Sequence, residues 1–265
     1  MAKCGDKSVG KLNSKGYNVV KLPRAGIEPM DILGKDDKAT EWLGALASVW
    51  NTTVALPTAS TAPALDISGQ ESNSLDLSLG LKMLGNVLAA FGASTPSLDL
   101  AYKKARTLQF TFGNVNSTTV QPLQAGNYLA GGVLNTANPV VRHYMLEDEA
   151  EAFLIFDVLK SNEISVVATD EHGVGVTVDA GVIQSMVGAK VGVKAAGSST
   201  TKLTYTGTVP VTFAFRAFEI SFNQGAWQLQ GTKSDELSFA ATVGGSAEPV
   251  GDPIMLRPAG LINLK

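Results

Sequence analysis

The chain has 265 residues, of which 45% are hydrophobic and 17% charged, a composition that excludes intrinsic disorder and is typical of a protein that buries a core. Its net charge of −3 argues against nucleic acid as a partner, because phosphate binding requires a concentrated basic surface. No apolar run approaches the roughly 18 residues of a transmembrane helix, so the sequence predicts none.

Residues 1–15 carry four lysines at four-residue spacing, with the single cysteine of the chain, Cys4, among them. This segment has no apolar core and no cleavage site, so we expect neither secretion nor a lipobox lipoprotein. One cysteine excludes an internal disulfide framework and fits the reducing cytosol. Two interpretations stay open: a solvated basic tail, or lipidation of Cys4, in which an acyl chain and the lysines supply two membrane signals.

Residues 16–64 are expected to form short strands and one helix. Residues 16–23 are typical of a strand that ends at a proline, and residues 26–34 of a turn followed by a strand. Apolar side chains recur at helical spacing within residues 38–50, which predicts a helix that faces the core. The Thr-, Ser- and Pro-rich residues 51–64 predict a loop or an edge strand.

Residues 73–112 contain two conflicting periodicities. Apolar residues first alternate with polar ones, as in a strand with one apolar face, at Leu75, Leu77, Leu79 and Leu81. From residue 79 to 91 the same face continues at helical spacing. After an apolar tip, a second alternating stretch includes Leu108 and Phe110. We interpret residues 73–112 as a long amphipathic pair that refolds during function, because such a conflict is unfavourable in a static protein.

Residues 113–142 are rich in Gly, Asn and Thr and contain short strand candidates. Residues 147–160 predict a helix, because acids lie near the N-terminal end and a lysine lies at the C-terminal end, where each complements the helix dipole. Residues 209–222 predict a long strand. The parity of its apolar positions changes at Ala217–Phe218, which indicates a β-bulge.

Residues 172–197 show the most regular pattern in the chain. Alternation of apolar with Gly, Thr and Asp residues predicts a β-hairpin with arms at 164–182 and 187–205 and a turn at Gln184–Ser185. Each arm reaches the roughly 9–11 residues with which a tilted strand crosses a bilayer. The apolar positions singled out are Val174, Val176, Val178, Val187, Val191 and Val193.

The last part of the chain has a different character. Residues 231–249 have the composition of an exposed linker that proteases can reach. Residues 252–265 contain an apolar strip that is too small to fold alone, so we expect it to dock on the main body. Its apolar members are Ile254, Leu256, Leu261, Ile262 and Leu264.

Motifs for catalysis and metal binding are missing from the sequence. The only two histidines, His143 and His172, lie in no metal-ligand or triad spacing. Asp170 and His172 would share one strand face, as a dyad or half of a metal site, although an exposed polar face explains them more simply. No dinucleotide or phosphate-loop fingerprint occurs. We therefore predict no enzyme, no metal site and no nucleic-acid partner.

Taken together, four features resemble those of the bacterial gasdermins: Cys4, the segment Gly16–Leu33, the two amphipathic pairs, and a short apolar tail after a linker. The resemblance spans essentially the whole chain, and its specificity lies in residues 17–33 and in the order of the features. It implies an α+β fold with a twisted, mostly antiparallel central sheet and surrounding helices. It also implies a pore-forming domain, residues 1–237, and a short autoinhibitory peptide, residues 238–265.

The resemblance further implies an anti-phage protein that is cytoplasmic while autoinhibited and lies in the cell inner membrane after cleavage. An activating protease encoded nearby would cut around Leu237 and Ser238, and Cys4 would carry a palmitate, with no other cofactor. The two amphipathic pairs would then re-form as four long strands of a large homo-oligomeric ring, because in lipid every backbone polar group must be paired. The apolar positions named for residues 73–112 and 172–197 would face membrane lipid. The alternative is a soluble β-rich binding or interaction module without membrane activity.

Overall fold

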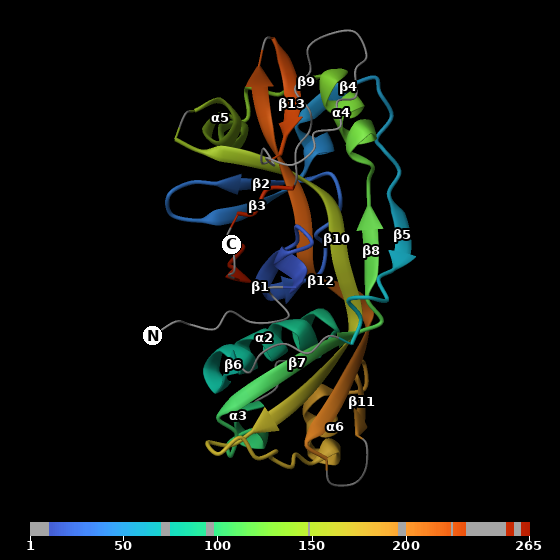
Figure 1. Ribbon diagram of the computed structural model, residues 1–265, viewed down its shortest axis with the longest axis vertical. Helices are drawn as coiled ribbons and strands as arrows, with labels where there is room; N and C mark the ends of the chain where they lie inside the picture. The colour runs from blue at the N-terminus through green and yellow to red at the C-terminus, as the bar shows by residue number, and fades with distance from the viewer. Residues whose placement is uncertain are drawn as a thin grey trace.

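A computed structural model describes residues 11–69, 75–93, 98–147, 149–195, 200–223, 225–231, 253–256 and 261–265. They form an elongated α+β structure built along two long antiparallel strands, β10 (Glu151–Thr169) and β12 (Lys202–Asn223), as Figure 1 shows. Every other strand of the large sheet pairs with one of these two directly or through one neighbour. The predicted α+β fold with a mostly antiparallel sheet is confirmed.

The middle of the sheet has the order β14-β1-β12-β10-β2-β3. Its outer strands are β1 (Asn18–Arg24), β2 (Asp31–Lys35), β3 (Thr40–Ala45) and β14 (Leu261–Ile262). The strands off this path are β5 (Ser60–Pro63), β6 (Leu75–Asp76), β7 (Thr107–Gly113), β8 (Asn116–Thr119), β11 (Gly192–Ala195) and β13 (Ala226–Gln230). A separate two-stranded sheet pairs β4 (Trp50–Thr52) with β9 (Gly132–Leu134).

Helices lie at both ends of the long strands (Figure 1). Around the end that is lower in the view lie α2 (Leu77–Ala90), α3 (Leu98–Ala101) and α6 (Ala180–Val187). Around the upper end lie α4 (Pro122–Ala130) and α5 (Pro139–Leu146), and the 3-10 helix η1 (Leu46–Ser48) links β3 to β4.

The upper part of the sheet is buried on both faces. Leu154 and Phe156 of β10 belong to a cluster on one face, and Phe153 and Ile155 to a cluster on the other. We call the second cluster the tail-side core; its buried members are Val20, Ile27, Leu33, Phe153, Ile155, Val158, Phe215, Ala217, Ile262 and Leu264. A third cluster, the lower core, joins α2, α3, α6, β7 and the lower halves of β10 and β12.

Two predicted helices are wrong. Residues 147–160 lie largely in β10, because a strand buried on both faces is apolar at nearly every position and therefore also satisfies a helical spacing. Residues 38–50 form β3, η1 and the start of β4 instead. Gly44 has a φ angle of 98°, in the left-handed region, so a continuous right-handed helix cannot pass through it. Helix α4 and the first half of α5 lie in residues 113–142, for which only short strands were expected.

The predicted hairpin at residues 172–197 is absent from the described part of this segment. Among the described residues, strand structure in its two arms is limited to the end of β10 in the first arm and to β11 and the start of β12 in the second, and its expected turn lies inside α6. The Asp179 side chain caps α6 by accepting hydrogen bonds from the backbone N–H groups of Gly181 and Val182 at 2.8 and 3.0 Å. A capped helix thus overrides the two-residue alternation in this structure.

Other expectations agree better with the structure. Residues 73–112, whose pattern fits both a strand and a helix, contain both, since β6 covers Leu75–Asp76 and α2 begins at Leu77. The predicted strands at the start of the chain, the edge strand β5 and the long strand β12 are present. The register between β10 and β12 shifts between Ile155 and Asp157, which face Ala217 and Arg216, so the extra residue lies in β10, next to the position in β12 where the parity change indicated a bulge.

Candidate functional site: the docked C-terminal tail and the lower core

The described C-terminal residues form a strand that bonds to two separate strands of the sheet. β14 pairs in parallel with β1, with Val19 opposite Leu261 and Val20 opposite Ile262. Immediately beyond, the Lys265 N–H donates to the Thr40 carbonyl at 3.2 Å, and the Trp42 N–H donates to the Lys265 carbonyl at 3.3 Å. Residues 261–265 therefore lie between β1 and β3.

This position closes the middle of the sheet. β1 and β3 are the two ends of the five-strand path β1-β12-β10-β2-β3, and the tail bonds to both of them. Figure 1 shows the red C-terminal end in the space between β1 and the β2–β3 pair. The tail consequently covers two strand edges that would otherwise present unpaired backbone groups.

A second part of the tail, residues 253–256, is held by one asparagine. The Asn18 side-chain amide donates to the Ile254 carbonyl at 2.8 Å, and its side-chain oxygen accepts from the Leu256 N–H at 2.8 Å. The Ile254 N–H donates to the Ala217 carbonyl of β12 at 2.9 Å. We refer to the groups that hold residues 253–265, from Asn18–Val20, Thr40, Trp42 and Ala217, as the tail site.

The apolar residues predicted for the tail are the ones that pack. Ile262 and Leu264 are 4% and 8% exposed and complete the tail-side core. The intervening Asn263 and the following Lys265 are exposed, so the strand presents one apolar face inward. Ile254 and Leu256 are partly buried against the same core, and Leu261 packs against a neighbouring cluster. The prediction that this strip docks on the main body is confirmed.

A buried carboxylate lies next to the tail site. Asp157 is fully buried; its Oδ2 accepts from Tyr17 Oη at 2.7 Å and from Arg216 Nε and Nη2 at 2.9 and 2.6 Å. Its Oδ1 accepts from Ser117 Oγ at 2.7 Å. Burial, followed by the nearby Asp157 charge, raises the pKa of Tyr17, so the phenol keeps its proton and donates. Because Tyr17 precedes Asn18 in the chain, this network anchors the backbone that holds the tail.

The lower core holds most of the residues predicted to face lipid. Six of them are buried in it: Leu108, Phe110, Val176, Val178, Val187 and Val191. Four are partly buried against it: Leu75, Leu77, Leu81 and Val193. Leu79 is half-buried, and Val174 is 61% exposed. The structure thus brings the two amphipathic pairs together in one cluster, with α2 and α6 in helical form.

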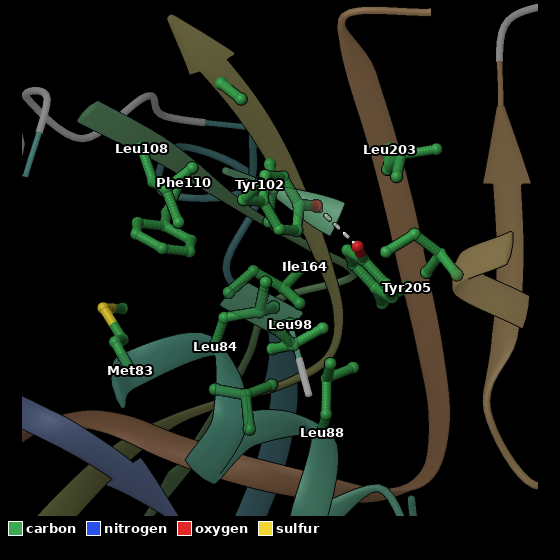
Figure 2. Close-up of a cluster of buried hydrophobic side chains, with 14 of the residues drawn as sticks. Met83, Leu84, Leu88, Leu98, Tyr102, Leu108, Phe110, Ile164, Leu203 and Tyr205 are labelled. Carbon is green, nitrogen blue, oxygen red and sulfur yellow. Dashed lines mark hydrogen bonds between the residues drawn. The ribbon is translucent and has the colours of Figure 1, made fainter. Parts of the chain in front are cut away.

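Packing in the lower core is close and contains one polar pair. At Gly80 of α2 an added Cβ would lie 2.9 Å from the Cβ of Leu108, so the helix rests directly on β7. The hydroxyl groups of Tyr102 and Tyr205 are 2.7 Å apart and are surrounded by apolar side chains, as Figure 2 shows. Burial raises the pKa of Tyr102 to about 12 and also raises that of Tyr205.

Three residues singled out in the sequence, Cys4, Leu237 and Ser238, lie outside the described residues. Among the residues that are described, no group of three or more His, Cys, Asp or Glu side chains could hold a metal ion. His172 is exposed, and Asp170 accepts hydrogen bonds from its N–H and from that of Val174 in a turn. No helix in the described ranges is long and apolar enough to span a membrane.

The sequence did not reveal the partners of the tail. Asn18, Thr40 and Trp42 lie far from the tail along the chain, and nothing in their local pattern marks them as partners. Asp157 carried a visible signal, since it is the only charged residue in the apolar run Phe153–Leu159. A lone acid in such a run, once it is placed in a strand, requires buried hydrogen-bond donors.

The fold and the docked tail define the class of protein: an α+β protein organised along one long, twisted antiparallel sheet that a C-terminal strand closes. The solved structure of a bacterial gasdermin from Bradyrhizobium tropiciagri shares this fold, with a TM-score of 0.61, 18% identity, and coverage of 99% of this chain and 97% of that one.

Sequence comparison identifies the family. Residues 20–241 match the model of the Bacterial Gasdermin Family. The chain is 34% identical to Gasdermin bGSDM of Vitiosangium sp., with 100% of this chain and 99% of the relative covered. It is 33% identical to Gasdermin bGSDM of Lysobacter enzymogenes, with 85% and 84% covered. The chain belongs to the bacterial gasdermin family, and the resemblance deduced from its sequence is confirmed.

Proposed function

We propose that this protein is a pore-former that its C-terminal tail inhibits until a protease removes the tail. Residues 1–237 would form the pore, and residues 238–265 would be the inhibitory peptide. An activating protease encoded nearby would cut around Leu237 and Ser238. The membership of the chain in the gasdermin family supports pore formation as its activity.

The observation that carries the proposal is the position of the tail. It bonds to both ends of the five-strand path and completes the tail-side core with Ile262 and Leu264. In this position the tail occupies the edge of β1 at Val19 and Val20 and the edge of β3 at Thr40 and Trp42. Removal of the tail would expose backbone groups on two strands and apolar side chains beneath them. Both changes favour association with a second copy or with a membrane.

The lower core supplies the segments that would enter the membrane. The first half of α2 carries apolar residues with a two-residue alternation, and the alternation of the residues before α6 extends into it as far as Val182, so as strands these stretches would have one apolar and one polar face. They flank β7 and β11, which already pair with the long strands β10 and β12. Many copies of the resulting strands would close into one homo-oligomeric barrel in contact with lipid, because an open sheet edge is not tolerated in hydrocarbon.

The proposal extends to the biological setting that the resemblance to bacterial gasdermins implies. The inhibited protein would be cytoplasmic, and the cut protein would permeabilise the cell inner membrane and kill a phage-infected cell. A palmitate on Cys4, together with the lysines of the N-terminal segment, would supply two membrane signals. Intact mass spectrometry tests the palmitate, because the Cys4→Ser variant must lose the added mass.

Dye release from liposomes tests the proposal. Uncut protein should release no dye, and cleavage within residues 230–250 should start the release. Leakage by the uncut chain, or no leakage after complete removal of the tail, contradicts the proposal. The second of these outcomes would favour a soluble interaction module, in which the tail is a permanent strand of the fold.

A further inference from the structure

The tail site has the characteristics of a site that binds an extended peptide. The bound strand contributes backbone hydrogen bonds to β3 and a parallel ladder to β1, while Ile262 and Leu264, two residues apart, enter the tail-side core. Peptides that add a strand to a sheet edge bind in this way, with affinity from the main chain and specificity from alternate side chains.

The contacts of the tail do not depend on its covalent link to the rest of the chain. Every hydrogen bond and apolar contact described for it involves residues 253–256 or 261–265. Asn18 recognises only backbone groups, namely the carbonyl of Ile254 and the N–H of Leu256. A separate peptide with the sequence of residues 253–265 could therefore make the same contacts.

A cut in the region of residues 238–252 consequently breaks none of these contacts. What it changes is the effective concentration of the tail, which is on the order of millimolar for a segment held by a short tether. After a cut, this value falls to the actual concentration of released peptide. Occupancy of the tail site then follows mass action, with the bound fraction set by peptide concentration relative to the dissociation constant.

From these observations we infer that the tail site is a reversible acceptor for tails in trans, so that a tail released from one copy of the chain binds a cut second copy. This inference rests on the proposed function insofar as the bound tail inhibits. It adds that cleavage alone does not activate the protein, because the tail must also dissociate. Activation would then be suppressed wherever released tail accumulates above its dissociation constant.

Binding is tested first, without a membrane. In the full chain, a recognition sequence for a site-specific protease replaces residues 238–244, and the cut protein is titrated against a fluorescent peptide of residues 253–265. Fluorescence anisotropy should show saturable binding with a dissociation constant between about micromolar and millimolar, the range in which a tethered tail is bound and a released one dissociates. The uncut chain, whose site is filled, should bind far less peptide.

Variants of the peptide keep the protein constant, so misfolding cannot explain their effect. A peptide with Ile262→Asp should bind at least tenfold more weakly, because it places a charge in the tail-side core. A peptide with Asn263→Asp, which adds the same charge at an exposed position, should bind within about twofold of the natural sequence. In the protein, Asn18→Ala should weaken binding about tenfold, because both hydrogen bonds to the tail are lost.

Dye release then separates this inference from the proposed function. Peptide added to the cut protein before liposomes should suppress leakage, with half-suppression near the dissociation constant. Cut protein that leaks but shows no saturable binding overturns the inference and leaves cleavage-dependent pore formation intact. Saturable binding that does not suppress leakage overturns the inhibitory role of the tail. Equal binding of the Ile262→Asp and Asn263→Asp peptides also overturns the inference, since the site would lack the specificity described.

Discussion

Replacement of Ile262 by aspartate in the uncut chain should activate the protein without a protease. Ile262 is 4% exposed, so the substitution loses burial worth about 1.5–3 kcal/mol. A carboxylate left buried without a partner would cost several kcal/mol more. The tail is held by a short ladder and by hydrogen bonds that each contribute about 1 kcal/mol. The combined loss is comparable to the free energy that these bonds and the burial of Leu264 supply, so the tail should leave the site.

Two measurements check this prediction. Uncut Ile262→Asp protein should release dye from liposomes, and its Trp42 and Lys265 amides, which bond between β3 and the tail, should exchange hydrogen faster. Asn263→Asp is the matched control, because it adds the same charge at the next, exposed position and should change neither result. Rapid exchange without any leakage would refute the inhibitory role of the tail. Unchanged exchange would refute the packing argument itself.

Three further predictions concern other parts of the molecule. Val174→Asp should leave the thermal stability of the uncut chain nearly unchanged, because Val174 is 61% exposed. Dye release after cleavage should be lost, because the charge would face lipid, and retained leakage would contradict that role. Asp157→Ala should lower the free energy of unfolding, measured in urea, by about 3–5 kcal/mol, because Arg216 and Tyr17 lose their acceptor. Asp157→Asn should lower it less, and equal stability of the two variants and the unmodified protein would contradict the network. The free energy of unfolding should fall above pH 10, because tyrosines of the unfolded chain lose their protons near pH 10.0. In the folded chain, Tyr102, with a pKa of about 12, and Tyr205, whose pKa is also raised, keep theirs. The double variant Tyr102→Phe, Tyr205→Phe should show a shallower fall in urea denaturation between about pH 9 and 11.

The elements that the sequence predicted correctly are those with one dominant local signal. β1 contains a proline near its end, β7 alternates strictly, and β12 is a long apolar run with a parity change. The docking of the tail also followed from its composition alone, because five apolar residues in so short a strip need a partner surface. In each case the signal lies within a few residues, and no competing structure satisfies it.

The errors arose where tertiary context decides between two possible structures. Burial of β10 on both faces removes its alternation, so the acidic residues before it suggested a helix start. In α6, Asp179 supplies a cap and the apolar residues Ile183 and Val187, four apart, face the core, so a helix forms where the alternation of residues 174–182 ends. The closure of the sheet by the tail joins residues more than 200 positions apart, such as Asn18 and Ile254, and no local pattern encodes it.

Two of the three helices of the lower core, α2 and α6, bury their apolar residues incompletely. In α2 the leucines at positions 77, 79 and 81 are only half-buried, whereas Met83, Leu84, Val87 and Leu88 are buried. A two-residue alternation cannot keep to one side of a helix, so the first turns of α2 contribute less packing than its second half. α6 has eight residues, buries only Ile183 and Val187, and leaves Val182 46% exposed.

Short helices with little burial are marginal on their own, so α6 and the first turns of α2 depend on their contacts with the sheet. We therefore expect the amides of residues 77–81 and 180–187 to exchange hydrogen faster than those of β10 and β12 in the uncut protein. Amide exchange followed by mass spectrometry measures both groups in one experiment, with α4 as an internal comparison for a short helix outside the lower core. Protection of α6 equal to that of β10 would mean that the helical form is as stable as the sheet. The alternation of residues 174–182, which runs into the start of α6, would then need an explanation other than refolding.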